Sequence, residues 1–162
     1  MAPDRADDLV VLSLHEAGVV LVVVGGTAAV LQGAPIITED LDIVHHQTPE
    51  NVDRLLAWLL AHGAYHRFDL ANRRLPPTRE QLAGTGQLNF QTDIGNLDVL
   101  CELGPGEGYE QLLDDTFVLA SGVRVLDLAR LIVVKARAGR PKDRAVLPVL
   151  IATLDEKRRA KS

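Results

Sequence analysis

The chain has 162 residues, 47% of them hydrophobic, and a formal net charge of −5. This length gives room for one compact domain with one core, and the composition is that of a globular protein rather than a disordered or fibrous one. No apolar run approaches the ~18 residues that a spanning helix needs, and mostly charged residues at positions 4–8 stand where a signal peptide is apolar. We therefore expect one cytoplasmic domain over residues 1–162 that has no membrane partner.

The cysteine count and the charge exclude further classes of protein. Cys101 is the single cysteine, so the chain has no internal disulfide and no thiolate zinc cluster. The negative net charge provides no global field that would attract nucleic acid. Binding of nucleic acid would need a local basic patch, and the clearest one in the sequence is at residues 157–161.

Hydrophobic periodicity predicts alternating helices and strands in the first part of the chain. In order, it predicts a helix over residues 8–16, a buried strand over 19–24, a turn at Gly25-Gly26, a helix over 27–32, a strand over 40–44 and an amphipathic helix over 51–62. The run at 19–24 is rich in valine, whose branched side chain disfavours a helix. The glycine pair is therefore expected between a strand and a helix.

The second part of the chain begins with a segment of little periodicity. Arginines, prolines and glycines interrupt residues 67–86, and we expect an irregular excursion there. The elements expected after it are strands over 88–92, 97–101, 117–120 and 123–126, arranged as two hairpins, helical turns over 109–113, a helix from the Asp127 cap to Ala138 and a last helix kinked at Pro148. The predicted fold class is α/β (α+β), a mixed sheet flanked by helices, with a C-terminal helical part at about 127–160.

Three aspartates lie on the predicted strands. Asp40 and Asp42 are two positions apart, so their side chains leave one face of a strand about 7 Å apart. Asp98 alternates in the same way between Leu97 and Val99. If the two strands are neighbours, the carboxylates converge and require a divalent cation such as Mg²⁺ or Mn²⁺. The pattern indicates a two-metal phosphoryl-transfer site, although a single D-x-D strand is also the ordinary pattern of a solvent-facing edge.

The Gly25-Gly26-Thr27 segment adds a second feature of phosphate chemistry. Free backbone N–H groups at the start of a helix can bind a phosphate. The segment is not followed by the G-K-[ST] of a Walker loop, and it does not have the G-x-G-x-x-G pattern of a dinucleotide-binding turn. It is therefore a candidate phosphate-binding turn of another class.

Cationic side chains are expected near the two C-terminal helices. Lys135 falls on the apolar stripe of the helix after Asp127, where it either pairs with an anion or extends its stem to solvent. Lys142 and Arg140 lie near the start of the last helix, where a solvated basic turn is the alternative. These cations are a third feature of the sequence, after the acids and the glycine turn.

Together, these motifs resemble those of the polymerase-β-like nucleotidyltransferase superfamily. The resemblance lies in V-V-V-G-G-T at 22–27, T-E-D-L-D-I at 38–43 and L-D-V-L at 97–100. These segments are similar to the glycine pair, the acid-x-acid strand and the later third acid of that superfamily.

The C-terminal part resembles one branch of the superfamily. D-L-A-R-L-I-V-V-K at 127–135, followed by A-G-R-P-K-D at 138–143, is similar to single-domain proteins related to the abortive-infection type IV toxin nucleotidyltransferases. The resemblance covers about residues 19–150 and is weak over 67–86.

The resemblance implies a fold, a set of site residues and a reaction. Asp40 and Asp42 would hold two Mg²⁺ (or Mn²⁺) ions, and Asp98 would be a further ligand and the general base. The triphosphate would be lined and neutralised by Gly25, Gly26, Thr27, Lys135 and Lys142. The implied reaction is in-line attack of an acceptor hydroxyl on the α-phosphorus of a nucleoside triphosphate, with release of pyrophosphate. The implied partners are the nucleotide, an acceptor such as tRNA, a protein or a small molecule, and a cognate antitoxin in a toxin–antitoxin or phage-defence pair.

One departure from the superfamily leaves a second interpretation open. Many relatives carry an arginine shortly before the acidic strand, whereas Pro35-Ile36-Ile37 stands there in this chain. The grip on phosphate is then weaker, or it comes from Arg140 or Lys142. The alternative function is a non-catalytic binding or regulatory module with the same fold, and a third is a small ligand-binding domain without phosphate chemistry.

Overall fold

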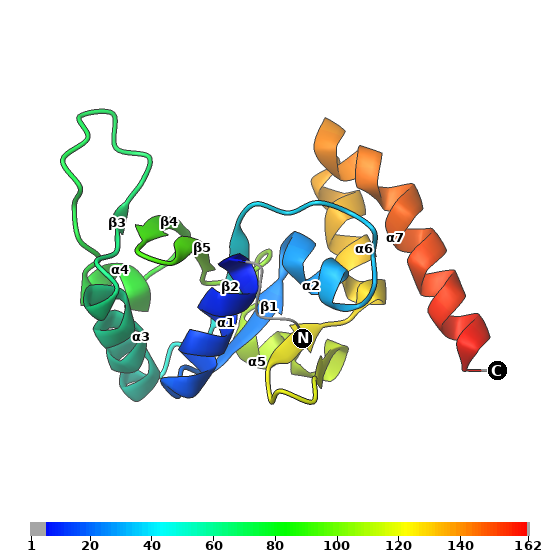
Figure 1. The fold of residues 1–162 in the computed structure, drawn as a ribbon, viewed down its shortest axis with the longest axis horizontal. Helices are drawn as coiled ribbons and strands as arrows, with labels where there is room; N and C mark the ends of the chain where they lie inside the picture. Colours follow the sequence, from blue (N-terminus) through cyan, green and yellow to red (C-terminus); the bar gives the residue numbers. More distant parts are fainter. Residues whose placement is uncertain (1–5, 162) are drawn as a thin grey trace.

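The computed structural model describes residues 6–161, with side chains from Asp8 onward. Helices and strands alternate along the chain, and Figure 1 shows their arrangement. In order, they are α1 (Ala6–Glu16), β1 (Leu21–Val24), α2 (Gly25–Leu31), β2 (Leu41–His45), α3 (Pro49–Ala61), β3 (Tyr65–His66), α4 (Arg79–Ala83), β4 (Gln87–Thr92), β5 (Gly95–Leu100), α5 (Tyr109–Leu112), the 3₁₀ helix η1 (Leu113–Asp115), β6 (Thr116–Val118), β7 (Arg124–Leu126), α6 (Leu128–Ala138) and α7 (Pro141–Ala160).

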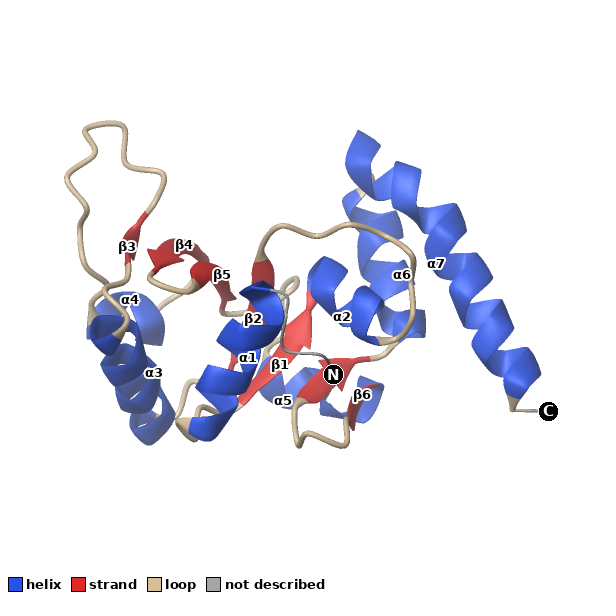
Figure 2. Cartoon of the chain, viewed as in Figure 1, coloured by secondary structure: helices blue, strands red, loops and turns tan. Residues whose placement is uncertain are grey.

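The strands form one seven-stranded mixed sheet in the order β3-β4-β5-β2-β1-β7-β6. Within it, β1 pairs antiparallel with β2 and parallel with β7, while β2 pairs parallel with β5. The two outer hairpins, β4–β5 and β6–β7, are antiparallel. Helices surround the strands in Figure 2. The prediction of an α/β chain with a mixed sheet flanked by helices is therefore confirmed.

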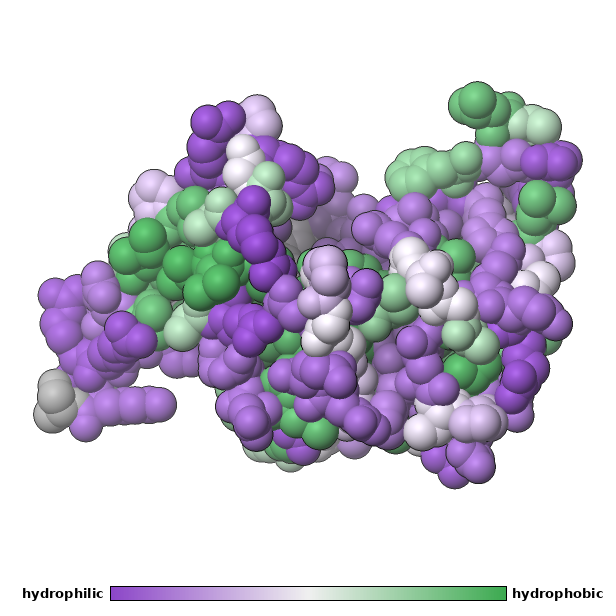
Figure 3. Space-filling view, turned by 180° about the vertical axis from the view of Figure 1, so that it is seen from behind, coloured by the Kyte–Doolittle hydropathy of each residue, from purple (hydrophilic) through white to green (hydrophobic). Residues whose placement is uncertain are grey.

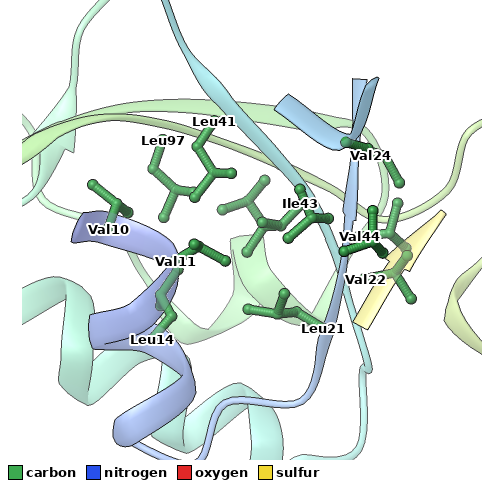
Figure 4. Packing of buried hydrophobic residues seen from close by; sticks show 14 of the residues in the cluster. Val10, Val11, Leu14, Leu21, Val22, Val24, Leu41, Ile43, Val44 and Leu97 are labelled. Atoms are coloured by element: carbon green, nitrogen blue, oxygen red, sulfur yellow. The ribbon is translucent and has the colours of Figure 1, made fainter. Parts of the chain in front are cut away.

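The core forms where α1 packs against β2 and β5. Val10, Val11 and Leu14 of α1 are fully buried. In Figure 4 they face the side chains of Leu41 and Leu97 from the sheet. Because side chains alternate along a strand, Leu41 and Leu97 point into this core while Asp42 and Asp98, one position later, leave the opposite face. The alternation read from the sequence thus separates an apolar face from an acidic one.

Two predictions of local structure need correction. The glycine pair is not a turn before a helix, since Gly25 and Gly26 are the first residues of α2. Residues 67–86 are not irregular throughout, because α4 forms within this segment. The Thr78 side chain accepts from the backbone of Gln81, whose side chain in turn accepts from the backbone N–H of Thr78. This reciprocal cap stabilises a helix of five residues.

The two C-terminal helices lie side by side (Figure 1). The predicted cap is confirmed, since the Asp127 side chain accepts from the Arg130 backbone N–H at 2.8 Å. Gly139 ends α6 with a φ of +63°, and α7 continues through Pro148 to Ala160. Among the described residues, no helix combines the length and the apolar character needed to cross a bilayer.

Residues 67–78, here called the excursion, project from the sheet at the end opposite to α7 (Figure 1). A backbone hydrogen bond from His66 to Leu75 closes its base. Beyond that base, Phe68 and Leu70 are 72% and 106% exposed. Figure 3 shows apolar side chains on this projecting part of the surface. The excursion thus joins an exposed apolar tip to a base that is anchored on the sheet.

Candidate functional site

A cleft of about 550 Å³ lies between the sheet and the two C-terminal helices. Its walls come from the ends of β1 and β2, the start of α2, the loop before β2, and α6 and α7. The polar and glycine residues that line it are Gly25, Gly26, Thr38, Glu39, Asp40, Asp42, Gln87, Asp98, Lys135, Arg140 and Lys142. All of the predicted site residues except Thr27 therefore line one cavity.

Asp42 and Asp98 meet because β2 and β5 are parallel neighbours. In their register, Asp42 lies directly opposite Asp98. The two carboxyl groups therefore lie side by side in the cleft. Burial, followed by a hydrogen bond with the Asp98 side chain and by the charge of Asp98, raises the pKa of Asp42 to about 7, although the charge of Lys135 opposes the rise. The fold thus places a carboxyl group with a raised pKa directly beside a second carboxyl group.

Asp40 lies just before β2 rather than on the strand. One of its carboxylate oxygens accepts a hydrogen bond from Asn96 Nδ2 at 2.9 Å. The other lies 3.3 Å from Arg67 Nη2. Both oxygens are thus engaged by groups of the chain itself, which distinguishes Asp40 from the acid pair of β2 and β5.

Arg67 joins two of the three aspartates. Its Nη1 lies 2.7 Å from Asp98 Oδ1, and its Nη2 pairs with Asp40. Nη1 also donates to the Phe90 carbonyl oxygen at 3.1 Å, and the guanidinium lies over the Phe68 ring. With its side chain only 12% exposed, Arg67 is a partly desolvated cation among the acids. The sequence analysis assigned no role to this arginine.

Gly25 and Gly26 line the cleft at positions where larger side chains would not fit. Gly25 has a φ of +65°, and a Cβ there would overlap Asp42 Oδ2. A Cβ on Gly26 would lie 2.5 Å from Thr38 Cγ2. The absence of side chains lets the start of α2 approach the acidic strand and the loop before it. Gly25 therefore leaves space that the Asp42 carboxylate occupies.

Thr27 does not line the cleft, in contrast to the expectation from the resemblance. Its side chain is fully buried. Its hydroxyl lies 3.4 Å from the carbonyl oxygen of Asp40, to which it donates. The position of Thr27 supports the backbone at Asp40 rather than a ligand in the cavity.

The cations of the opposite wall are organised by Asp143, a residue that the sequence analysis did not select. The Asp143 carboxylate is fully buried, lies 3.2 Å from Lys135 Nζ and pairs with Arg140 Nε at 2.6 Å. Its hydrogen bond with Arg140, and then that with Lys135, lowers the pKa of Asp143 to about 2. The anion required by a lysine on an apolar stripe is thus Asp143. Lys142 lines the same cleft and is exposed.

The donor set fits a hard divalent cation only in part. Among residues 8–161, whose side chains are described, no group of three or more His, Cys, Asp or Glu residues is arranged to hold a metal ion. Asp42 and Asp98 offer hard oxygen ligands on neighbouring strands. Asp40 is held by Asn96 and Arg67 instead. The pair fits the cation, whereas the third carboxylate would need new partners.

One signal in the sequence could have identified more of this site. The R-P-K-D stretch at 140–143 places an aspartate at the third position of a helix that starts with proline, which is typical of a capping residue. No comparable pattern marks Arg67, whose partners are distant in the sequence.

The chain matches no family model and no curated protein.

Proposed function

We propose that the protein is a Mg²⁺- or Mn²⁺-dependent nucleotidyltransferase with a polymerase-β-like fold. The reaction transfers a nucleoside monophosphate from a nucleoside triphosphate to an acceptor hydroxyl and releases pyrophosphate. The observation that supports it most strongly is the direct opposition of Asp42 and Asp98 on neighbouring parallel strands, in a cleft whose other wall is cationic. An acidic wall and a basic wall around one cavity suit a substrate that carries phosphates together with a cation.

The residues of the cleft have distinct roles in this proposal. Asp40, Asp42 and Asp98 would hold the divalent cation, which when bound neutralises charge on the attacking and leaving oxygens. The Asp98 carboxylate takes the proton of the acceptor hydroxyl as its oxygen forms the bond to the α-phosphorus. The bond from that phosphorus to the bridging oxygen breaks, and pyrophosphate leaves toward the wall with Lys135 and Lys142.

The glycines and Arg140 complete the binding site in this proposal. Gly25 and Gly26 line the cleft as the first residues of α2, where backbone N–H groups without intrahelical partners can bind a phosphate. Arg140 lines the same cleft, so it can supply the phosphate contact that the missing arginine before β2 would make. The substrate phosphates then lie between the acidic strands and α6–α7.

The acceptor in this proposal is a hydroxyl of an RNA such as tRNA, of a protein or of a small molecule. The resemblance in the C-terminal part supports a toxin that is paired with a cognate antitoxin or acts in phage defence. A net charge of −5 gives no long-range attraction to RNA, so an RNA acceptor would be recognised through local contacts.

The proposal is tested by incubating the protein with each α-³²P-labelled nucleoside triphosphate, Mg²⁺ and fractionated cell RNA, protein or small molecules. We expect label to be transferred to one fraction by the wild-type chain and not by Asp42→Asn. Asp53→Asn is the matched control, because Asp53 is an exposed carboxylate paired with Arg79 away from the cleft. An absence of transfer together with an absence of nucleotide and metal binding would refute the proposal.

A second candidate function is a non-catalytic module with the same fold. Arg67 favours it, because this internal cation already pairs with Asp40 and Asp98 where an enzyme would hold a metal ion. This candidate predicts that Asp42→Asn leaves the cellular phenotype of the protein unchanged. Loss of the phenotype in that variant would exclude it.

A further inference from the structure

Arg67 and the acidic face of the sheet form one ion-paired unit. The single guanidinium lies 2.7 Å from Asp98 and 3.3 Å from Asp40. All three side chains are at least partly sheltered, with exposed fractions of 12% for Arg67, 9% for Asp98 and 34% for Asp40. Arg67 is thus the cation that pairs directly with two of the three aspartates.

The same guanidinium is part of the excursion that projects into solvent. Arg67 is its first residue, and the Arg67 backbone N–H donates to the Asn89 carbonyl oxygen of β4 at 3.0 Å. Its side chain lies over Phe68, the next residue, which is 72% exposed. Loss of the Arg67 ion pairs would therefore remove side-chain contacts from the first residue of the excursion.

A divalent cation and this guanidinium cannot both neutralise the same carboxylate oxygens. Asp40 has Asn96 on one oxygen and Arg67 on the other, so it can bind a cation only by giving up one of these partners. Asp98 Oδ1 likewise faces Arg67. Two like charges at one carboxylate pair repel each other, so binding of one opposes binding of the other.

From this competition we infer that Arg67 is a positioning residue, a tethered counter-ion that holds Asp40 and Asp98 in the absence of a divalent cation and leaves them when one binds. The inference rests on the proposed function, because it concerns the cation of that site. It makes the excursion a regulatory element: binding of the cation removes the ion pairs that tie its first residue to the acidic face and so loosens its base. By thermodynamic reciprocity, a partner that draws the excursion outward strengthens cation binding.

The first test measures Mn²⁺ binding alone by titration calorimetry, on the full chain and on Arg67→Met. Removal of the competing charge is expected to lower the Kd for Mn²⁺ about tenfold. Arg73→Met is the matched control, since Arg73 lies in the same excursion but pairs with Asp69 at its exposed tip. We expect its Kd to stay within about twofold of the wild-type value.

The second test needs no variant and remains informative if Arg67→Met does not fold. Trypsin cleaves after Arg73 and Arg74 in the excursion and after Arg158 in α7, which serves as the internal reference. If Mn²⁺ releases the base of the excursion, the ratio of cleavage in the excursion to cleavage after Arg158 rises about threefold or more with the metal.

The outcomes separate this inference from the proposed function. If the wild-type chain binds Mn²⁺ and transfers label, equal or weaker Mn²⁺ binding by Arg67→Met overturns the inference alone. An unchanged cleavage ratio in saturating Mn²⁺ also overturns it. If neither the wild-type chain nor Arg67→Met binds Mn²⁺, both the inference and the metal-dependent proposal are wrong.

Discussion

Asp42 on β2 and Asp98 on β5 occupy directly opposite positions of a parallel strand pair. Burial of Asp42, followed by a hydrogen bond with the Asp98 side chain and by the charge of Asp98, raises the Asp42 pKa to about 7. The register of two strands thus contributes to the raised pKa of a carboxyl group in the cleft.

The raised Asp42 pKa predicts how stability depends on pH. A carboxyl whose pKa rises from 3.8 to about 7 on folding stabilises the fold fully below pH 3.8, and this contribution is lost as the pH rises through 7. Asp42→Asn, which cannot ionise, should therefore gain free energy of unfolding relative to wild type between pH 5 and pH 8. The expected gain is on the order of 2 kcal/mol, measured by urea unfolding at both pH values.

Exposed Asp53 provides the control for this pH dependence. Asp53→Asn should shift the free energy of unfolding relative to wild type by nearly the same amount at pH 5 and pH 8. If Asp42→Asn behaved in the same way as Asp53→Asn, the fold would not raise the pKa of Asp42.

Gly25→Ala should disturb the acid pair as well as the backbone. Gly25 has a φ of +65°, and an added Cβ would overlap the Asp42 carboxylate. Gly63 is a close match, with a φ of +62° and no atom within 4 Å of an added Cβ. Gly63→Ala should cost about 1 kcal/mol from the backbone alone. Gly25→Ala should cost at least about 1 kcal/mol more and lower nucleotidyl transfer at least about tenfold, and equal costs would contradict the packing described here.

Asp143→Asn should weaken the cationic wall. The buried Asp143 carboxylate pairs with Lys135 and Arg140, and its pKa of about 2 means that it stabilises the fold above pH 3.8 and loses that contribution as the pH falls through 2. At pH 7 we expect Asp143→Asn to lower the free energy of unfolding by about 2 kcal/mol.

Asp143→Asn should also weaken binding of the nucleoside triphosphate in the proposed reaction. Because Lys135 and Arg140 lose the anion that orients them, the KM for the nucleoside triphosphate should rise more than kcat falls. Steady-state kinetics would measure this change on protein whose folding has been verified, with Asp53→Asn as the reference. A fall in kcat at constant KM would assign Asp143 a different role.

Asp98→Asn should abolish transfer while keeping the fold. The amide preserves the shape of the side chain but cannot accept the acceptor proton, and we expect the rate to fall by about 10³ or more. Circular dichroism would confirm the fold, and binding of the nucleotide without metal should be retained. A rate within about tenfold of wild type would show that another residue is the base.

The sequence predicts the faces of the strands but not their neighbours. Alternation of Leu41 with Asp42 and of Leu97 with Asp98 is a local signal, so the buried and acidic sides follow from short segments. The pairing of β2 with β5 joins residues 56 positions apart, as the Asp40–Asn96 hydrogen bond also does. No local pattern specifies such a register, which depends on how the whole chain packs.

Arg67 and α4 show two different reasons why parts of the structure escaped prediction. Arg67 reaches Asp40 across 27 positions from a segment without periodicity, so its role depends on tertiary packing. For α4, a local signal was present, since T-R-E-Q at 78–81 has the spacing of a capping box. The prolines that precede this helix and the glycines that follow it obscured a pattern that the residues do contain.

The order of the strands also determines which parts of the sheet open most easily and which can accept insertions. β2 and β5 have a partner on both sides, whereas β3 and β6 are the edges of the sheet. Amide hydrogen exchange should therefore be slowest around Asp42 and Asp98 and fastest at the two margins. Insertions at the β6–β7 turn would leave the centre undisturbed, so new recognition surfaces can arise at the margins while the acid pair at the centre persists.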